Sequence, residues 1–292
     1  MKLTSRWVMG PATLLVVAAL AACGATTTVG VEPTPSTRPT SSIPEGSVPT
    51  GADQVVIRVN SCCGLVPFGV GLRYVPRLSV FGDGTTVVPA AQGPDGQVPA
   101  VTPLRRGHLS RAQILDLLSA ADEAGLLGDE IDFGSPAVTD VPSTTVTLVV
   151  DGHTYRQSAY ALHEDFEDHL PAPAREARDR LRDFLTEAER VVGRPDEAFR
   201  PERVTVFAIV PGRDGGDLSG PIHAWPLEDP AVWPEGERAR SYRCRTFEGS
   251  DADAVLAFAN PTAEGTLWQV GEDRYRLVFR PLLPDETDGC AR

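Results

Sequence analysis

The alternation of apolar and polar positions predicts a chain built mainly from short strands. A β-branched run at 55–59 indicates the first strand. Two later pairs of alternating segments are each separated by an Asp-Gly turn signal, which favours a tight hairpin. They lie at 77–88 around Asp83-Gly84 and at 145–160 around Asp151-Gly152. Three further strands are predicted closer to the C-terminus, at 204–210, 266–270 and 275–279, the last two as a hairpin.

Helical spacing of apolar residues occurs between these strand segments. The first helix opens at Ser110 with the capping-box pattern Ser110-Arg111-Ala112-Gln113, and apolar residues follow at helical spacing. A second helix, at about 173–192, is apolar on one face and charged on the other. A short third helix begins within 250–253. This order predicts an α+β fold, with small antiparallel sheets each covered by one or two helices.

Composition divides the chain into four parts. Residues 1–22 form an apolar segment with a basic start, and residues 23–52 are rich in Thr, Pro, Ser and Gly, which predicts a disordered tether. A proline-framed turn at 193–201 marks a further boundary. We therefore expect an α+β domain over 53–198 and a second, smaller α+β domain over 199–292. One continuous domain with a shared sheet is the alternative.

The N-terminal segment is typical of a secretory signal. Lys2 and Arg6 precede an apolar stretch from Met9 to Leu20, which is too short to span a membrane, since a spanning helix needs roughly 20 residues. The stretch ends in Leu20-Ala21-Ala22-Cys23, which resembles the lipobox of bacterial lipoproteins. An ordinary secreted protein with a chance cysteine is the alternative.

This resemblance implies a specific modification of Cys23. In bacterial lipoproteins the cysteine thiol receives a diacylglyceryl group, and the signal peptide is cleaved immediately before it. Two acyl chains hold a protein stably at a bilayer, whereas one chain gives only marginal binding. The expected location is therefore the outer face of the cell membrane, with the protein anchored through lipid.

Turn-rich segments within 55–190 resemble uncharacterised actinobacterial lipoproteins. The similarity rests on Tyr74-Val75-Pro76, on 81–85, on 139–145 and on Asp151-Gly152. All basic residues except Lys2 are arginine, a bias that fits a GC-rich genome. The resemblance implies an extracytoplasmic fold and carries no activity with it.

The charge of the chain narrows the range of partners. The formal net charge is −13, so anionic phosphate backbones and headgroups are repelled. We expect no nucleic-acid binding, and we expect the lipid on Cys23 to provide the membrane attachment. The predicted partner is an unknown protein or envelope component.

Four cysteines remain beside Cys23. Disulfides persist outside the cytoplasm, and we expect one between Cys244, on a predicted strand, and Cys290. It would close a loop of about 45 residues, worth about 3–4 kcal/mol in the chain-entropy model. The adjacent Cys62 and Cys63 have several possible states: a vicinal bridge, free thiols, bonds to the other two cysteines, or a redox pair.

No motif in the sequence matches a known catalytic or metal-binding framework. The densest group of potential ligands, at 163–169, lacks the H-E-x-x-H pattern and is interpreted as a solvated acidic stretch, with a weak divalent-cation site as the alternative. The segment 214–217 lacks the closing glutamate of a calcium loop. Gly216–Gly220 differs by one residue from the nucleophile elbow of hydrolases. We expect no metal and no cofactor.

Two tryptophans lie in a proline-rich segment at 225–234. Trp225 and Trp233 are predicted to pack beneath the C-terminal sheet, and a rigid recognition surface for peptides or sugars is the alternative. Because the sequence combines a tether, an acidic folded part and no catalytic constellation, the protein is expected to bind rather than to catalyse. A hydrolase or redox enzyme that uses Cys62-Cys63 or 163–169 is one alternative, and a secreted protease inhibitor is another.

Overall fold

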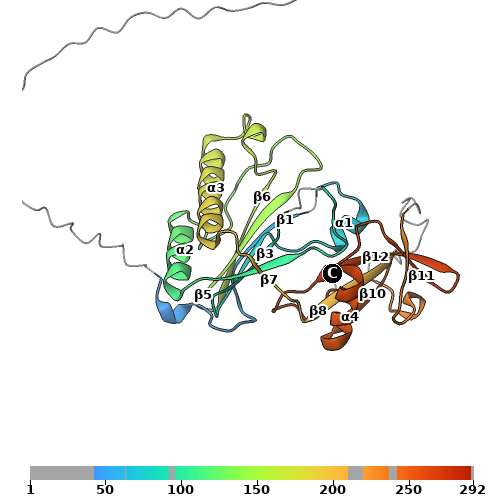
Figure 1. Ribbon diagram of the computed structural model, residues 1–292. Coiled ribbons are helices and arrows are strands. Elements are labelled where there is room, and N and C mark those ends of the chain that lie inside the picture. Colours follow the sequence, from blue (N-terminus) through green and yellow to red (C-terminus); the bar gives the residue numbers. More distant parts are fainter. Residues whose placement is uncertain (1–42, 63, 92–95, 210–219, 237–241, 291–292) are drawn as a thin grey trace, which may run out of the picture. The chain divides into compact units, whose positions relative to one another are not determined.

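The alternating segments predicted from the sequence form two sheets. The computed structural model describes residues 43–62, 64–91, 96–209, 220–236 and 242–290. Within these ranges it contains two sheets in which almost all strand pairs are antiparallel, and four α-helices (Figure 1). The predicted α+β fold is confirmed. Each predicted strand and helix occurs, with ends that differ by three residues at most.

The first sheet has seven strands in the order β6-β5-β1-β2-β3-β4-β7, and every pair is antiparallel. The bounds are β1 (Val55–Cys62), β2 (Leu78–Phe81), β3 (Thr85–Pro89), β4 (Leu104–His108), β5 (Ser143–Val150), β6 (His153–Tyr160) and β7 (Glu197–Ala198). The β5–β6 hairpin closes at Asp151 and Gly152, which both have positive φ. This is the left-handed backbone that the Asp-Gly pair favours at a hairpin turn.

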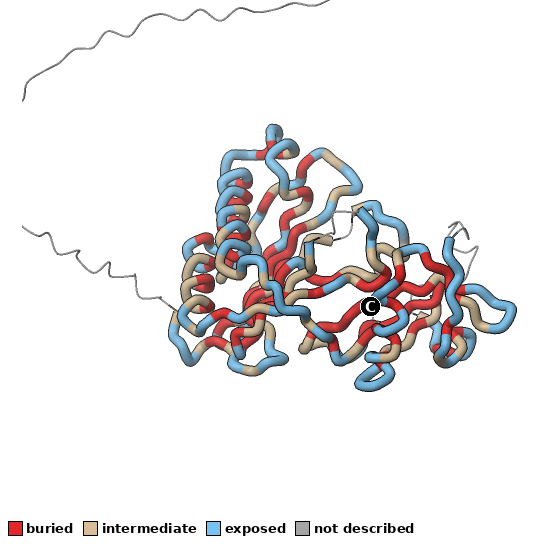
Figure 2. The backbone as a smooth tube through the Cα atoms, in the orientation of Figure 1, coloured by how far each residue is buried: buried red, intermediate tan, exposed pale blue. Residues whose placement is uncertain are grey.

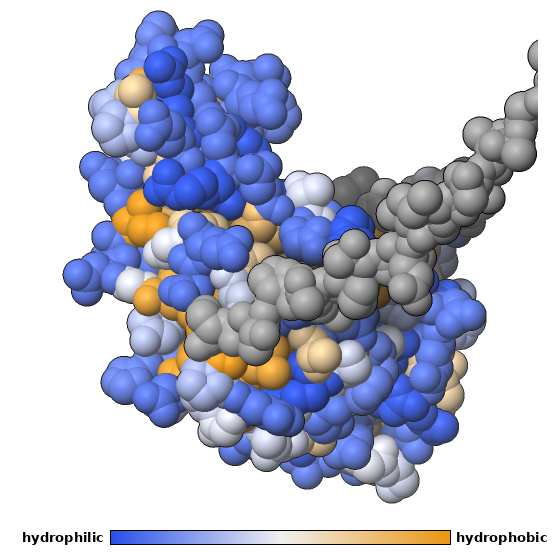
Figure 3. Space-filling view, turned by 90° about the vertical axis from the view of Figure 1, so that its left-hand side faces the viewer, coloured by the Kyte–Doolittle hydropathy of each residue, from blue (hydrophilic) through white to orange (hydrophobic). Residues whose placement is uncertain are grey.

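Two helices cover one face of the first sheet. Helix α2 (Arg111–Glu123) and helix α3 (Ala172–Val192) lie side by side on it (Figure 1). Apolar side chains of both helices pack with the inward-facing residues of β1, β2 and β5 in one buried cluster. In Figure 2 the buried positions follow the strands and the helix sides that face them. The outward side of α3 is charged, and this side of the molecule is mostly hydrophilic, with hydrophobic residues gathered near its middle (Figure 3).

The predicted capping box at the start of α2 is present. The Ser110 side chain accepts a hydrogen bond from the Gln113 N–H, and the Gln113 side chain accepts one from the Ser110 N–H at 2.9 Å. Two backbone donors that a helix start leaves unpaired are satisfied in this way.

Replacing Ser110 with alanine is expected to lower the free energy of unfolding by about 1 kcal/mol, because the Gln113 N–H loses its acceptor. Urea unfolding followed by circular dichroism measures the change. The control is Thr186→Ala, on the exposed side of α3, which is expected to leave stability unchanged. Equal stability of the Ser110→Ala protein and the original would contradict the prediction.

The second sheet has five strands in the order β10-β8-β12-β11-β9. The bounds are β8 (Arg203–Ile209), β9 (Ile222–Ala224), β10 (Tyr242–Glu248), β11 (Leu267–Val270) and β12 (Asp273–Pro281). Only β9 runs parallel to its neighbour, β11. Helix α4 (Gly249–Ala259) packs on this sheet in a second buried cluster rich in aromatic rings. A short helix, α1 (Phe68–Leu72), follows β1 and contacts β12.

The packed part of the chain begins before the predicted end of the tether at residue 52. Val48 is buried in the first core cluster, next to a short 3₁₀ helix, Glu45–Ser47. Arg111 of α2 donates hydrogen bonds to the carbonyl oxygens of Val48 and Pro49 at 2.8 and 2.9 Å. Residues 43–52 therefore belong to the fold, because a few core contacts outweigh their turn-rich composition. The rest of the predicted tether lies outside the described residues.

A C-terminal segment at 282–290, which we call the clasp, contacts both sheets. Leu283 is buried with side chains of β2 and β3. Asp285 accepts two hydrogen bonds from Arg58 of β1, at 2.7 and 2.8 Å. Glu286 pairs with the buried Arg280 of β12 at 2.6 Å. The clasp therefore supplies the carboxylates that neutralise these two guanidinium groups.

The predicted division at 193–201 falls on the segment that contains β7. This two-residue strand pairs with β4 at the edge of the first sheet, and β8 of the second sheet begins at Arg203. The two domains over 53–198 and 199–292 stay a prediction. None of the helices in the described ranges has the length and apolar content that crossing a membrane requires.

Candidate functional site

The potential metal ligands at 163–169 do not converge on one point. His163 precedes a 3₁₀ helix, Glu164–Phe166, and its Nδ1 atom lies 3.4 Å from an Asp165 carboxylate oxygen. Both side chains are exposed. Glu167, by contrast, points into the protein and is buried. Among the residues that the structure describes, no three His, Cys, Asp or Glu side chains are grouped so that they could hold a metal ion.

Glu167 is the centre of a buried ionic cluster that the sequence did not reveal. Its Oε1 atom accepts a hydrogen bond from Arg178 Nε at 2.7 Å, and Oε2 accepts one from Arg182 at 3.1 Å. The Arg178 side chain is 0% exposed. It also donates to the carbonyl oxygens of Phe133 and Tyr160, at 3.1 and 3.0 Å. The interpretation of 163–169 as a wholly solvated stretch is therefore wrong at Glu167.

The charge state of Glu167 follows from these contacts. Burial alone would raise the pKa of its carboxyl group, but hydrogen bonds and charges from Arg182 and Arg178 outweigh burial, and the pKa is lowered. The carboxylate is thus ionised at neutral pH and compensates two guanidinium groups. The cluster joins α3 to the chain segments around Phe133 and Tyr160. Its contacts are those of a structural element of the fold.

The spacing of residues along α3 could have indicated the ionic cluster around Glu167. The buried positions of α3 include Ala174, Ala177, Leu181 and Leu185, and Arg178 falls within the same stripe at i, i+3, i+4 spacing. An arginine at such a position needs a buried carboxylate. The acidic stretch just before the helix is where that carboxylate could have been sought.

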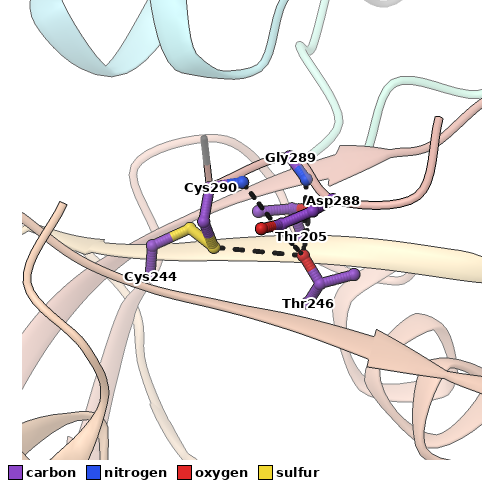
Figure 4. The surroundings of a disulfide bond; sticks show 6 residues. All are labelled: Thr205, Cys244, Thr246, Asp288, Gly289 and Cys290. Atoms are coloured by element: carbon purple, nitrogen blue, oxygen red, sulfur yellow. Dashed lines mark hydrogen bonds between the residues drawn. A yellow bond between two sulfur atoms is a disulfide. The ribbon is translucent and has the colours of Figure 1, made fainter. Parts of the chain in front are cut away.

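The predicted disulfide between Cys244 and Cys290 is confirmed (Figure 4). The two Cα atoms are 5.7 Å apart, with Cys244 on β10 and Cys290 at the end of the clasp. Asp288 supports the bend before Cys290, because its Oδ1 atom accepts from the Cys290 N–H at 2.9 Å and from the Thr246 hydroxyl at 2.8 Å (Figure 4). Cys62 is also disulfide-bonded. Its pairing with Cys244 or Cys290 is excluded, since those two are bonded to each other.

Several predicted sites fall on residues outside the described ranges. These are Cys23, Cys63, the segment 214–217 and most of Gly216–Gly220. Lipidation of Cys23 accordingly stays a prediction.

Trp225 and Trp233 lie in the core of the C-terminal part, which is the burial that the sequence predicts, and they do not form the alternative, an exposed recognition surface. Their side chains are 5% and 1% exposed. The two rings meet edge to face, with centroids 6.1 Å apart, and both pack against Phe247. The Trp225 indole N–H donates to the Glu228 carbonyl oxygen at 3.0 Å. Edge-to-face contacts of this kind stabilise the two rings in the core.

An open groove of about 850 Å³ lies between the end of α3 and strands β2 and β3. Two of its arginines are paired with glutamates of α3. Arg77 pairs with Glu189 at 2.5 Å and Arg190 pairs with Glu187 at 2.6 Å. Arg105 and Arg194 also line the groove, so its lining retains an excess of positive charge.

A smaller and more apolar pocket lies between α1 and the β11–β12 hairpin, and we call it the α1 pocket. It has a volume of about 220 Å³. Apolar walls come from α1, from Ala100 and from the second sheet, including Pro67, Val70, Trp268, Leu277 and Val278. Segments far apart in the sequence therefore converge here. An apolar hollow with a few polar groups is the usual form of a ligand site.

The polar lining of the α1 pocket includes a fixed ion pair. Arg73 lies 2.9 Å from Glu264, and it also donates to the Pro99 carbonyl oxygen at 2.9 Å. The Arg73 side chain is 12% exposed and the Glu264 side chain 40%. Among the described residues, no serine, cysteine or histidine lines the pocket. The arrangement suits binding of an apolar group flanked by polar atoms.

Comparison of the chain with protein-family models, with curated proteins and with solved structures finds no match. The function must therefore be inferred from the chain itself.

Proposed function

We propose that the protein is a lipid-anchored, extracytoplasmic lipoprotein of the cell membrane whose folded part acts by binding. The observation that carries this proposal is the Cys244–Cys290 disulfide in a chain that begins with a lipobox. Disulfides of this kind persist in oxidising compartments and are rare in the cytoplasm. The structural bond and the N-terminal motif therefore point independently to the same side of the membrane.

Binding is favoured over catalysis by the surroundings of the reactive residues. Glu167 forms ion pairs with two arginines. The described cysteines are all in disulfides. The α1 pocket has apolar walls and a fixed ion pair, which suit recognition of a partner. The partner is then a protein or envelope component, since the acidic chain repels nucleic acid.

Replacing Cys23 with alanine is expected to abolish lipidation, because the thiol is the acceptor of the lipid. Cells that express the protein are supplied with a clickable fatty acid, and the purified chain is assayed for label and for the mass of its N-terminal peptide. The original chain should carry label on Cys23, and the Cys23→Ala chain should carry none. Thr26→Ala, three residues on, serves as the control and should be labelled normally. An unlabelled original chain would refute the proposal.

A further inference from the structure

We propose that the α1 pocket binds one apolar side chain of an extended peptide segment from a partner protein, while Arg73 and Glu264 bind the flanking peptide groups. This inference rests on the proposed binding function and assigns it a site and a partner chemistry.

The volume of the pocket limits what it can hold. Pockets for drug-sized ligands and cofactors are roughly 300–1,000 Å³, whereas this one measures about 220 Å³. It therefore fits a single side chain of medium size, such as leucine, rather than a whole cofactor. The walls formed by Val70, Leu277 and Val278 are apolar, so the occupant is apolar as well.

The ion pair is complementary to a peptide backbone. A peptide group offers a carbonyl acceptor and an N–H donor, which match a guanidinium donor and a carboxylate acceptor. Arg73 is held in place by Pro99, by Thr102 at 3.3 Å and by Glu264, so its orientation is fixed before a ligand arrives. Glu264 is partly exposed and can accept from an incoming N–H. Such charge-assisted hydrogen bonds are stronger than neutral ones.

The surface beside the pocket is also suited to a protein partner. Leu65 and Val66 precede Pro67, which lines the pocket, and the Leu65 side chain is 80% exposed. Val98 is exposed as well, and its carbonyl oxygen accepts from the Glu264 N–H at 2.8 Å. Exposed apolar side chains gathered next to a pocket mark interaction surfaces.

Trp268 provides a reporter for the pocket. Its ring lines the pocket and is 2% exposed. The indole resonance should therefore respond when the pocket is filled.

The test uses the mature lipidated chain in lipid nanodiscs, with ¹⁵N-labelled tryptophan. The probe is N-acetyl-L-leucine amide, which presents one leucine side chain between two peptide groups, and N-acetylglycine amide is the matched control without the side chain. The leucine probe should produce a saturable shift of the Trp268 indole resonance, with a dissociation constant in the millimolar range. The glycine compound should produce none.

Three variants locate the effect. Glu264→Gln removes the charged acceptor and should weaken binding roughly three- to tenfold, while Glu272→Gln, at an exposed turn, should leave it unchanged. Ala263→Leu fills the pocket and should abolish the shift, with unfolding temperature measured to confirm that the variant is folded.

Four results would overturn the inference: no saturable shift, an equal response to both compounds, unchanged binding in Glu264→Gln, or retained binding in a folded Ala263→Leu protein. A Trp268 shift that follows protein concentration without any probe would assign the pocket to a second copy of this chain instead. Labelling of Cys23 is read out separately, so failure of the pocket and failure of the lipid anchor are distinguishable.

Discussion

Replacing Glu167 with glutamine is expected to lower the free energy of unfolding by about 3 kcal/mol, because removal of one partner from a buried ion pair leaves the other charge uncompensated. Arg178 has no exposed surface, and its side chain is fixed between Glu167 and the carbonyl oxygens of Phe133 and Tyr160. It cannot reach water without moving α3. Urea unfolding of the two proteins measures the difference.

A matched control exists on the same helix. Glu187 pairs with Arg190 at the surface, where water and salt screen the charges. Glu187→Gln is expected to leave stability unchanged within error. The double variant Glu167→Gln with Arg178→Met should lose less unfolding free energy than the sum of the two single variants. It lacks the Arg178 charge, so no buried charge of that residue is left without a partner. Additive losses would contradict a coupled ionic cluster.

The same cluster predicts a dependence of stability on pH. The pKa of Glu167 is lower in the folded protein than its ordinary value of 4.5. A carboxyl group with a lowered pKa stabilises the folded state at pH values above its ordinary pKa. This stabilisation is lost as the pH falls through the lower pKa of the folded protein. The original chain should therefore lose more stability below pH 4.5 than Glu167→Gln, which has no carboxyl group to protonate.

Removing the Cys244–Cys290 bond is expected to cost about 3–4 kcal/mol of unfolding free energy, because the bond closes a long loop in the unfolded chain. The two cysteines are 46 positions apart. The double variant Cys244→Ala with Cys290→Ala should unfold at a lower urea concentration than the original chain. Alanine is preferred to serine because position 244 is buried, and a serine there would carry an unpaired hydroxyl group.

The reduced original chain provides the comparison for this variant. Reductant also opens the disulfide of Cys62, whereas the double variant retains it, so the two measurements separate the contributions. Alkylation without reductant followed by peptide mapping should give a linked Cys244–Cys290 pair in the original. An unfolding curve of the double variant that coincides with that of the original would show that the bond adds no stability.

The sequence predicted the elements whose pattern is strong and local. The hairpin at Asp151-Gly152, the Ser110 cap and the amphipathic helix α3 each combine periodicity with a start or turn signal, and all are present. Strand β4 was missed because its sequence Leu-Arg-Arg-Gly-His has one apolar residue. Helix α1 was missed because two of its five residues are glycine, which disfavours a helix.

The site could be predicted only in part. The Cys244–Cys290 pairing follows from the compartment and from the few cysteines available. The α1 pocket does not, because it joins α1, Ala100 and the β11–β12 hairpin, and no local pattern reports such convergence. Two interpretations of Trp225 and Trp233 stayed open for a related reason, since a proline-rich segment can place aromatic rings outward or inward, and only contacts with the sheet decide between them.

The clasp has a consequence for the order in which the protein matures. Arg58 of β1 finds its carboxylate 227 residues later in the chain, at Asp285. Synthesis proceeds from the N-terminus, so β1 is made long before its guanidinium can be neutralised. Helices α2 and α3 can pack on one face of the first sheet early in synthesis. The other face is completed only after the clasp has been made. Completion of the fold is therefore a late event, and a nascent chain that has not reached Asp285 leaves Arg58 without its carboxylate partner.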